Sequence, residues 1–349
     1  MFHKALWMRN QKIGGPAVWA VYLSLFFFMP ISFFGSAQNL QSQAEHFADE
    51  GMFLNFSFHG RELALFLSFI IVGLATLLIG QERTTHSTDL TFALPFKRKD
   101  IFLSKWMFGI VHITTSILLN LLLCMVIVKF TILSEMVDAS FLLEFMILVI
   151  PFSIAIFTFC LFIGTIAGSM VSQFLLSVIF LWFPIGFFWL IGTFLTYHGV
   201  QINEVYDLHD PLHSFGDFMS AATLPIPVYE FSYFTNLDDS VSNSYTNMPN
   251  PFVFLSPLLY MIITFPLGIW LFTRSKNENN GRLLVFEKGK GFFSFGVVLC
   301  FALAFGMAGG GLFNSNNTPS LIGYYVSAGI GGILSYILLR KIIGLRLSR

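Results

Sequence analysis

Long apolar stretches alternate with short polar segments along the whole chain. A helix needs about 20 apolar residues to cross the hydrocarbon core of a bilayer, and eight stretches approach or exceed that length. They are residues 17–36, 62–80, 106–132, 141–168, 173–197, 252–273, 292–313 and 321–340. The pattern predicts an all-α integral membrane protein, a polytopic helical bundle with about eight transmembrane helices.

The basic residues predict which way this bundle faces. Of the 19 Lys and Arg residues, 17 lie at the N-terminus or in residues 81–105, 274–290 and 340–349. Because basic residues stay on the cytoplasmic side of short loops, both termini are expected inside a cell whose cytoplasmic membrane holds the chain. Seven spans would put one basic cluster on the wrong side. Segments 1–16, 81–105, 169–172, 274–291 and 341–349 are expected inside, and 37–61, 133–140, 198–251 and 314–320 outside.

The first apolar stretch also has features of a secretory signal peptide. Lys4, Arg9 and Lys12 precede it, and the small residues Gly35-Ser36-Ala37 follow. Its run of about 20 apolar residues is longer than the apolar region of a signal peptide, which favours a retained span. Cleavage stays an alternative, because residue 38 would lie outside in either case.

The composition sharpens this class. Of 349 residues, 55% are hydrophobic and 11% are charged, whereas soluble domains carry roughly 25% charged residues. Cys124, Cys160 and Cys300 fall within apolar stretches and are interpreted as packing residues, with neither a disulfide nor a metal site expected. Lys129 lies near the outer end of the third span, where Glu135 is a plausible partner. A role in a proton relay is the alternative, but the scarcity of midplane charge disfavours an ion-coupled carrier.

Glycines mark the expected contacts between helices. Gly164 and Gly168 form a GxxxG pair in the fourth span, and Gly309 and Gly310 lie in the seventh. Small residues let helix backbones approach closely in lipid. Tight packing within the chain is favoured, and a dimer seam or a moving contact is the alternative.

The segment between the second and third spans is the most informative loop. Glu82-Arg83 ends the second span, and Leu94-Pro95-Phe96-Lys97-Arg98-Lys99-Asp100 leads toward the third. Since proline suits the first turn of a helix, Pro95 is expected to open a short amphipathic helix on the inner membrane surface, with Phe96, Ile101 and Phe102 on its apolar side. Such a helix either anchors the loop to anionic lipid or docks a cytoplasmic partner.

At this loop the chain resembles a known family. The Glu82-Arg83 pair, the segment LPF-KRKD-IFLSK and the basic residues 2–12 before the first span are similar to permease subunits of ABC-2 type ABC transporters, whose core is type V exporter-like. Residues 280–287 resemble members from Gram-positive bacteria associated with acetoin utilisation. The resemblance divides the chain into an interfacial helix at 1–16, a six-span core at 17–275 and two additional spans in 276–349.

The resemblance implies an exporter subunit that is driven by a separate ATPase and moves a hydrophobic, amphipathic or peptide-like substrate. The residues expected to contact the ATPase are Glu82, Arg83, Leu94, Pro95, Phe96, Lys97, Arg98, Lys99 and Asp100. A second permease subunit, identical or related, and membrane lipid are the other implied partners, and no nucleic acid is expected.

The chain has no nucleotide-binding motif of its own. Lys288-Gly289-Lys290-Gly291 lacks the upstream Gly and the Ser or Thr of a P-loop. We therefore expect ATP and Mg²⁺ on the partner, with no cofactor and no catalytic residue on this chain. A secondary carrier, an intramembrane enzyme and a membrane sensor are the alternatives. An enzyme would need paired polar residues at helix depth, whereas His112 and Asn120 are isolated.

The longest outer segment, residues 198–251, is acidic and aromatic. Asp207, His209, Asp210 and His213 lie close enough in sequence to suggest a metal site, but a solvated turn at Asp210-Pro211 is favoured. Residues 215–234 are expected to form short re-entrant helices, and 236–251 a flexible loop.

Overall fold

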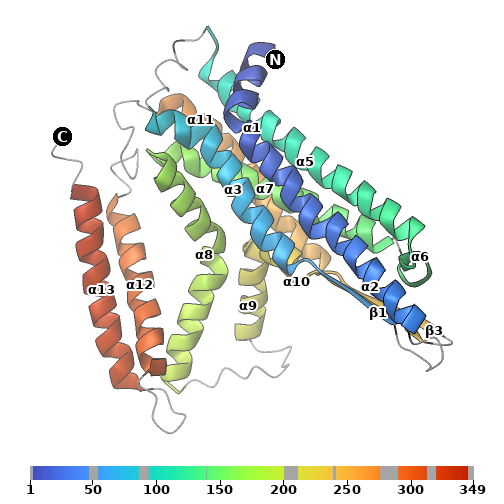
Figure 1. Cartoon of the computed structure of the whole chain (residues 1–349). Helices are drawn as coiled ribbons and strands as arrows, with labels where there is room; N and C mark the ends of the chain where they lie inside the picture. The colour runs from blue at the N-terminus through green and yellow to red at the C-terminus, as the bar shows by residue number, and fades with distance from the viewer. Residues whose placement is uncertain are drawn as a thin grey trace.

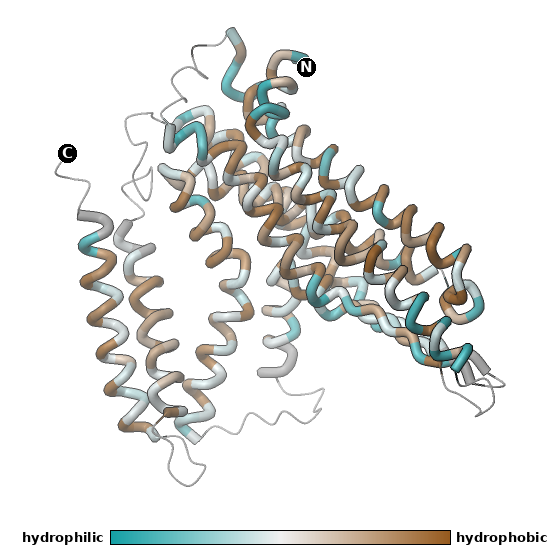
Figure 2. The backbone as a smooth tube through the Cα atoms, in the orientation of Figure 1, coloured by the Kyte–Doolittle hydropathy of each residue, from teal (hydrophilic) through white to brown (hydrophobic). Residues whose placement is uncertain are grey.

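The computed structural model describes residues 3–46, 54–85, 93, 95–138, 140–199, 211–238, 241–275, 290–312 and 320–344. In these ranges the chain forms a bundle of long helices with a small sheet, and the beginning of α1 lies at the opposite end of the bundle from the sheet (Figure 1). Hydrophobic residues dominate the middle of the long helices, and hydrophilic ones gather toward their ends (Figure 2).

Within these described ranges, eight helical stretches are long and apolar enough to cross a membrane, which confirms the predicted fold class. The first combines α1 (Lys4–Phe26), the π-helical η1 (Phe27–Ile31) and α2 (Ser32–His46). The others are α3 (Arg61–Thr84), α5 (Arg98–Phe130), α7 (Ser140–Ile166), α8 (Met170–Tyr197), α11 (Leu255–Arg274), α12 (Lys290–Leu312) and α13 (Leu321–Gly344).

The first helical column is longer than the sequence predicts. Helix runs without interruption from Lys4 to His46, so residues 4–16 continue into the span and residues 37–46 extend it. Pro16 lies inside α1, and a membrane helix tolerates the missing donor. A Cβ at Gly14 would meet Leu78 and Phe108 at 3.1 Å, so this glycine permits close packing where a break between two helices was expected.

Helices α3 and α7 form the centre of the bundle. In the most apolar stretch of each, 67% of residues are buried, against 17% in α8 and α11. The buried side chains of these two helices are mainly Leu, Ile and Phe, and examples with 0% exposure are Leu74, Leu78, Phe152 and Phe157. Helices α1, α5, α8 and α11 pack against this pair, and their outward apolar faces suit contact with lipid.

A three-stranded antiparallel sheet caps the end opposite the beginning of α1. Its order is β1 (Leu54–His59), β2 (Ser232–Asp238) and β3 (Val241–Asn247). Phe56, Phe58 and Tyr233 are buried against Phe141 of α7 or against each other. The expected flexible loop over 236–251 is therefore wrong for residues 236–238 and 241–247, because β3 pairs with β2 there.

Short helices complete this end of the molecule. They are α6 (Leu133–Met136), α9 (Pro211–Ala222), α10 (Ile226–Glu230) and the 3₁₀ helix η2 (Pro251–Phe254). Helices α9 and α10 occupy most of the segment where short helices are predicted. Asp207, His209 and Asp210 lie outside the described residues, as does the side chain of His213.

The last two helices form a hairpin at the side of the bundle (Figure 1). Glycines allow α12 and α13 to touch: a Cβ at Gly309 would lie 1.9 Å from the hydroxyl oxygen of Ser327, and one at Gly331 would lie 2.4 Å from Phe305. The hairpin meets α8 through Tyr197, which packs at the position a Cβ of Gly310 would take.

Candidate functional site

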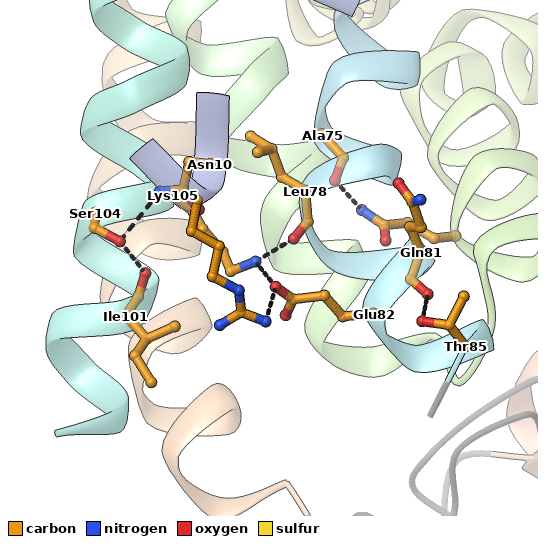
Figure 3. Close-up of polar contacts among 11 residues, drawn as sticks. Asn10, Ala75, Leu78, Gln81, Glu82, Thr85, Ile101, Ser104 and Lys105 are labelled. Atoms are coloured by element: carbon orange, nitrogen blue, oxygen red, sulfur yellow. Dashed lines mark hydrogen bonds and ion pairs between the residues drawn. The ribbon is translucent and has the colours of Figure 1, made fainter. Parts of the chain in front are cut away.

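Glu82 is the centre of a buried cluster of charges at the end of the bundle where α1 begins. Its Oε1 lies 3.0 Å from Nη2 of Arg9 on α1 and 2.8 Å from Nζ of Lys105 on α5. The side chains of Glu82 and Lys105 are 4% and 1% exposed. One carboxylate therefore ties three helices together, and we call Arg9, Glu82 and Lys105 the charged hub (Figure 3).

Local structure explains why Glu82 needs two cations. It lies in the last turn of α3, where the helix dipole presents partial negative charge that repels a carboxylate. Nζ of Lys105 also donates to the carbonyl oxygen of Leu78, one turn earlier on α3. The ammonium therefore compensates both the Glu82 carboxylate and a backbone carbonyl. Removing one member of such a buried pair leaves an uncompensated charge in a site with little water.

A second contact between α1 and α5 lies beside the hub. Nδ2 of Asn10, which is 3% exposed, donates to the hydroxyl of Ser104 at 3.2 Å. That hydroxyl donates in turn to the carbonyl oxygen of Ile101 at 2.8 Å (Figure 3). Asn10 thus holds the start of α1 against the start of α5, while the neighbouring Arg9 holds it against the end of α3.

Arg83 ties α3 to the turn between α7 and α8. Its guanidinium donates to the carbonyl oxygens of Ala167 at 2.5 Å and Thr165 at 3.1 Å, and the residue is 2% exposed. The hydroxyl of Thr84 accepts a hydrogen bond from the backbone N–H of Met170. Carbonyls at a helix C-terminus lack partners within the helix. Arg83 supplies hydrogen bonds to two such carbonyls at the end of α7 and thereby holds α3 against it.

Gln173 strengthens the same junction from α8. Its Nε2 donates to the carbonyl oxygens of Ala75 and Cys160, both at 3.1 Å. Gly164 makes room for that side chain, because a Cβ there would lie 2.5 Å from Nε2 of Gln173. Gly164 thus lies against a side chain of this same chain, whereas Gly168 lies just beyond the end of α7.

Arg98 connects the first turn of α5 to the end of α11. Its Nη1 donates to the carbonyl oxygens of Thr273 and Ser275, both at 3.1 Å. Behind it, Phe102 is 0% exposed and packs against Phe272 with ring centroids 5.5 Å apart. The loop that precedes α5 is therefore joined through α5 to both α1 and α11.

The expected short helix on the membrane surface is not a separate element in the described residues. The N-cap of α5 is Lys97, and the helix runs from Arg98 through the span to Phe130. Ile101 and Phe102 are buried inside the chain at 1% and 0% exposure, so they do not form an outward apolar face. They pack here because α11 lies beside them, a neighbour that the local pattern does not reveal.

The predicted contact residues differ in burial. Glu82 and Arg83 are buried and face other helices, whereas Pro95, Lys97 and Lys99 are exposed. Phe96, Arg98 and Asp100 are half-buried, and Phe96 lies against His3 with ring centroids 4.7 Å apart. Leu94 lies outside the described residues. Sequence reasoning missed Arg9 and Lys105, although an acidic residue in the last turn of a helix is a signal that cations must lie close by.

A cavity of about 240 Å³ adjoins the exposed group. His3 and Trp7 line it from α1 and the residue before it, and Asp100, Leu103 and Trp106 line it from α5. Among the described residues, no group of three or more His, Cys, Asp or Glu side chains could hold a metal ion. The charged and aromatic side chains at this end are suited to contacts between macromolecules.

Comparison with known proteins identifies the class. The family described as ABC-2 family transporter protein matches residues 10–277, and the chain belongs to that family. It is the membrane subunit of an ABC transporter, a multi-pass membrane protein whose family membership implies an ATPase partner.

One named relative supports the same assignment. The chain is 24% identical over 257 residues to "Probable ABC transporter permease YtrC" of Bacillus subtilis (strain 168), across 72% of this chain and 70% of that protein. No solved structure matches the chain. The family match ends at residue 277 and so does not include α12 and α13.

Proposed function

We propose that this chain is the permease subunit of an ATP-driven exporter in the cytoplasmic membrane, with both termini in the cytoplasm. A separate ATPase holds the ATP and Mg²⁺ and supplies the energy. The cargo is hydrophobic, amphipathic or peptide-like, and a second permease subunit and surrounding lipid complete the assembly. The observation that carries the proposal is the charged hub, which joins three helices at the end where the exposed basic residues lie.

We assign the contact with the ATPase to the residues around the start of α5, where Pro95, Lys97 and Lys99 are exposed and Phe96 is half-buried. Lys97 and Lys99 provide positive charge for an acidic partner surface, and Pro95 and Phe96 provide apolar contact. The adjoining 240 Å³ cavity, which Trp7 and Trp106 line, gives a side chain of the partner a place to insert. Aromatic pockets of this kind are typical centres of protein interfaces.

Transmission is assigned to the buried residues behind that contact. A displacement of the start of α5 acts on α3 and α1 through Lys105, Glu82 and Arg9. It acts on α11 through Arg98, while Arg83 links α3 to α7 and α8. A ligand shifts such a system only if it favours one arrangement over the other, so ATP must favour the ATPase conformation that moves α5.

The test replaces the apolar part of the contact. In the permease–ATPase complex reconstituted into lipid nanodiscs, the double change Pro95→Ser and Phe96→Ser should lower substrate-stimulated ATP hydrolysis about tenfold, the effect of losing about 1.4 kcal/mol. The matched control is Phe130→Ser, which alters a 78% exposed phenylalanine at the last residue of α5, far from the proposed contact.

The control should retain its stimulated rate. The proposal fails if the double variant assembles with the ATPase and keeps normal stimulation. It also fails if no ATPase from neighbouring genes associates with the intact chain.

A further inference from the structure

A cavity of about 450 Å³ lies between α1 and α5, apart from the charged hub. Its apolar lining includes Trp19, Leu23 and Leu119, which are 65%, 61% and 49% exposed. These residues belong to helices that cross the membrane, so their exposed faces contact hydrocarbon. The cavity therefore opens sideways to the bilayer and is accessible to molecules dissolved in it.

Polar side chains in the mainly apolar lining are Gln11 and Tyr22 on α1 and His112 and Asn120 on α5. Asn120 is 1% exposed, and its Nδ2 donates to the carbonyl oxygen of Ser116 at 2.9 Å. Among the described residues, neither Oδ1 of Asn120 nor Nε2 of His112 has a hydrogen-bond partner. A buried carbonyl oxygen without a donor is unfavourable, so the site lacks a donor that an occupant can supply.

The depth of these atoms limits what the occupant can be. Helix α5 has 33 residues, from Arg98 to Phe130, and at about 1.5 Å per residue Asn120 lies about 9 Å from its midpoint. That position falls within the roughly 30 Å hydrocarbon core. Water is scarce at this depth, and the lining contains no charged side chain that could neutralise an ion.

The α1 wall of the cavity is continuous helix, flanked by positions where a helix can bend. Its residues from Val18 to Phe26 lie between Pro16 and Pro30, and the π-helical η1 begins at Phe27. Prolines and π-helical turns are recognised causes of local bending in helices. The hydroxyls of Tyr22 and Thr115, 2.6 Å apart, link this wall to α5. The wall can thus adjust to an occupant while it stays attached to α5.

We propose that this cavity binds an uncharged amphiphile drawn from the bilayer, whose hydroxyl or N–H group donates to Asn120 and whose apolar part lies against Trp19, Leu23 and Leu119. The inference names the substrate class of the exporter and so rests on the function proposed above. His112 lies two turns before Asn120 on the same face of α5 and offers a second polar contact.

The experiment uses three photoactivatable probes with the same C16 chain: an alcohol, its methyl ether and its trimethylammonium analogue. Each is added to the purified full-length chain in nanodiscs without an ATPase. The alcohol should label peptides from residues 17–26 and 111–123 about fivefold more than the ether, which corresponds to one hydrogen bond. The cationic probe should label them least.

Variants locate the labelling in the cavity. Asn120→Leu should reduce labelling by the alcohol to the level of the ether. Leu119→Trp fills the cavity and should abolish labelling, whereas Leu122→Trp, at a 61% exposed leucine outside the lining, should leave it unchanged. Because Leu119 and Leu122 are both exposed to lipid, this pair keeps the test valid if Asn120→Leu does not fold.

Equal labelling by alcohol and ether, strongest labelling by the cation, or equal loss in both tryptophan variants would overturn the proposal. Since no ATPase is present, a failure here leaves the coupling proposal standing. A failure of coupling in the reconstituted complex, conversely, leaves this binding site standing.

Discussion

The body of the molecule, formed by α1 to α11, and the hairpin of α12 and α13 are built from similarly apolar helices, yet they are held together by different interactions. In the body, buried charges and amide side chains join helices distant in sequence: Arg9, Glu82 and Lys105 link α1, α3 and α5, and Gln173 links α8 to α3 and α7. The body also corresponds closely to the range of the family match, residues 10–277.

The hairpin is held mainly by close approach of its own two helices and by aromatic contacts to α8. Gly309 and Gly331 let the helices touch, and Tyr324 packs edge-on against Tyr197 with ring centroids 5.5 Å apart. Nε2 of His198 lies 2.6 Å from the hydroxyl of Tyr325. Apolar length is thus common to both regions, whereas buried polar contacts that join several helices distant in sequence characterise the body.

The largest expected effect is on the body. Glu82→Gln leaves Arg9 and the buried Lys105 without their counter-charge, which should lower the free energy of unfolding by about 3–5 kcal/mol and abolish stimulated ATP hydrolysis. The control, Glu62→Gln, alters an exposed glutamate in the first turn of the same helix, and should cost less than about 1 kcal/mol. Denaturation in mixed detergent measures both.

A double variant separates the stability cost of an unpaired Lys105 from the loss of the contact between α3 and α5. Glu82→Gln combined with Lys105→Met removes the uncompensated ammonium and should recover part of the lost stability. It should not recover coupling, since α5 and α3 are no longer joined there. Equal stabilities for Glu82→Gln and Glu62→Gln would show that the hub does not hold the body together.

An intermediate effect is expected within the hairpin. Gly309→Val places a side chain where Ser327 already lies, which should cost about 1–3 kcal/mol of local packing and push α12 from α13. The control, Gly329→Val, adds the same side chain where nothing lies within 4 Å.

A designed disulfide reports on this change. A Cβ at Gly332 would lie 3.6 Å from Cβ of Ala302, which suits a disulfide, so Ala302→Cys with Gly332→Cys should crosslink readily once Cys124, Cys160 and Cys300 are replaced by alanine. Gly309→Val should reduce crosslinking and Gly329→Val should not. Loss of stimulated ATP hydrolysis in Gly309→Val would show that the hairpin and the body are coupled after all.

The smallest effect is expected where the hairpin meets α8. Tyr325→Phe removes the hydroxyl that lies 2.6 Å from His198, and one such hydrogen bond contributes about 0.5–1.5 kcal/mol. Tyr336→Phe is the matched control, because both tyrosines are 56% exposed. Denaturation should rank Tyr325→Phe below the control. Identical curves would mean that aromatic packing alone attaches the hairpin to α8.

The spans were predictable because hydrocarbon imposes a length and a composition that few other environments require. Their ends were less so: α2 continues to His46 through polar residues that can be solvated beyond the membrane, and α5 begins as early as Arg98. The sheet was missed because its strands are short and rich in Asn and Ser. Alternation is nevertheless present, since Tyr233 and Thr235 are buried while Phe234 is 42% exposed.

The candidate site was only half predictable. Glu82 and Arg83 stood out as charges beside a span, but their partners Lys105, Thr165 and Ala167 lie 23, 82 and 84 positions away. A sequence pattern places residues on a helix and says little about which helix faces it. The same holds for His112 and Asn120, which are isolated in the sequence yet line one cavity together with α1.

The unbroken helical column from Lys4 to His46 connects the charged hub to the opposite side of the membrane. Its 43 residues span about 65 Å at 1.5 Å per residue, more than twice the thickness of the hydrocarbon core. If its hub end is the pivot, a tilt of about 5° displaces its far end by about 6 Å, since displacement grows with the length of the lever arm. A small tilt of this column at its hub end would thus become a displacement of several ångströms at its other end.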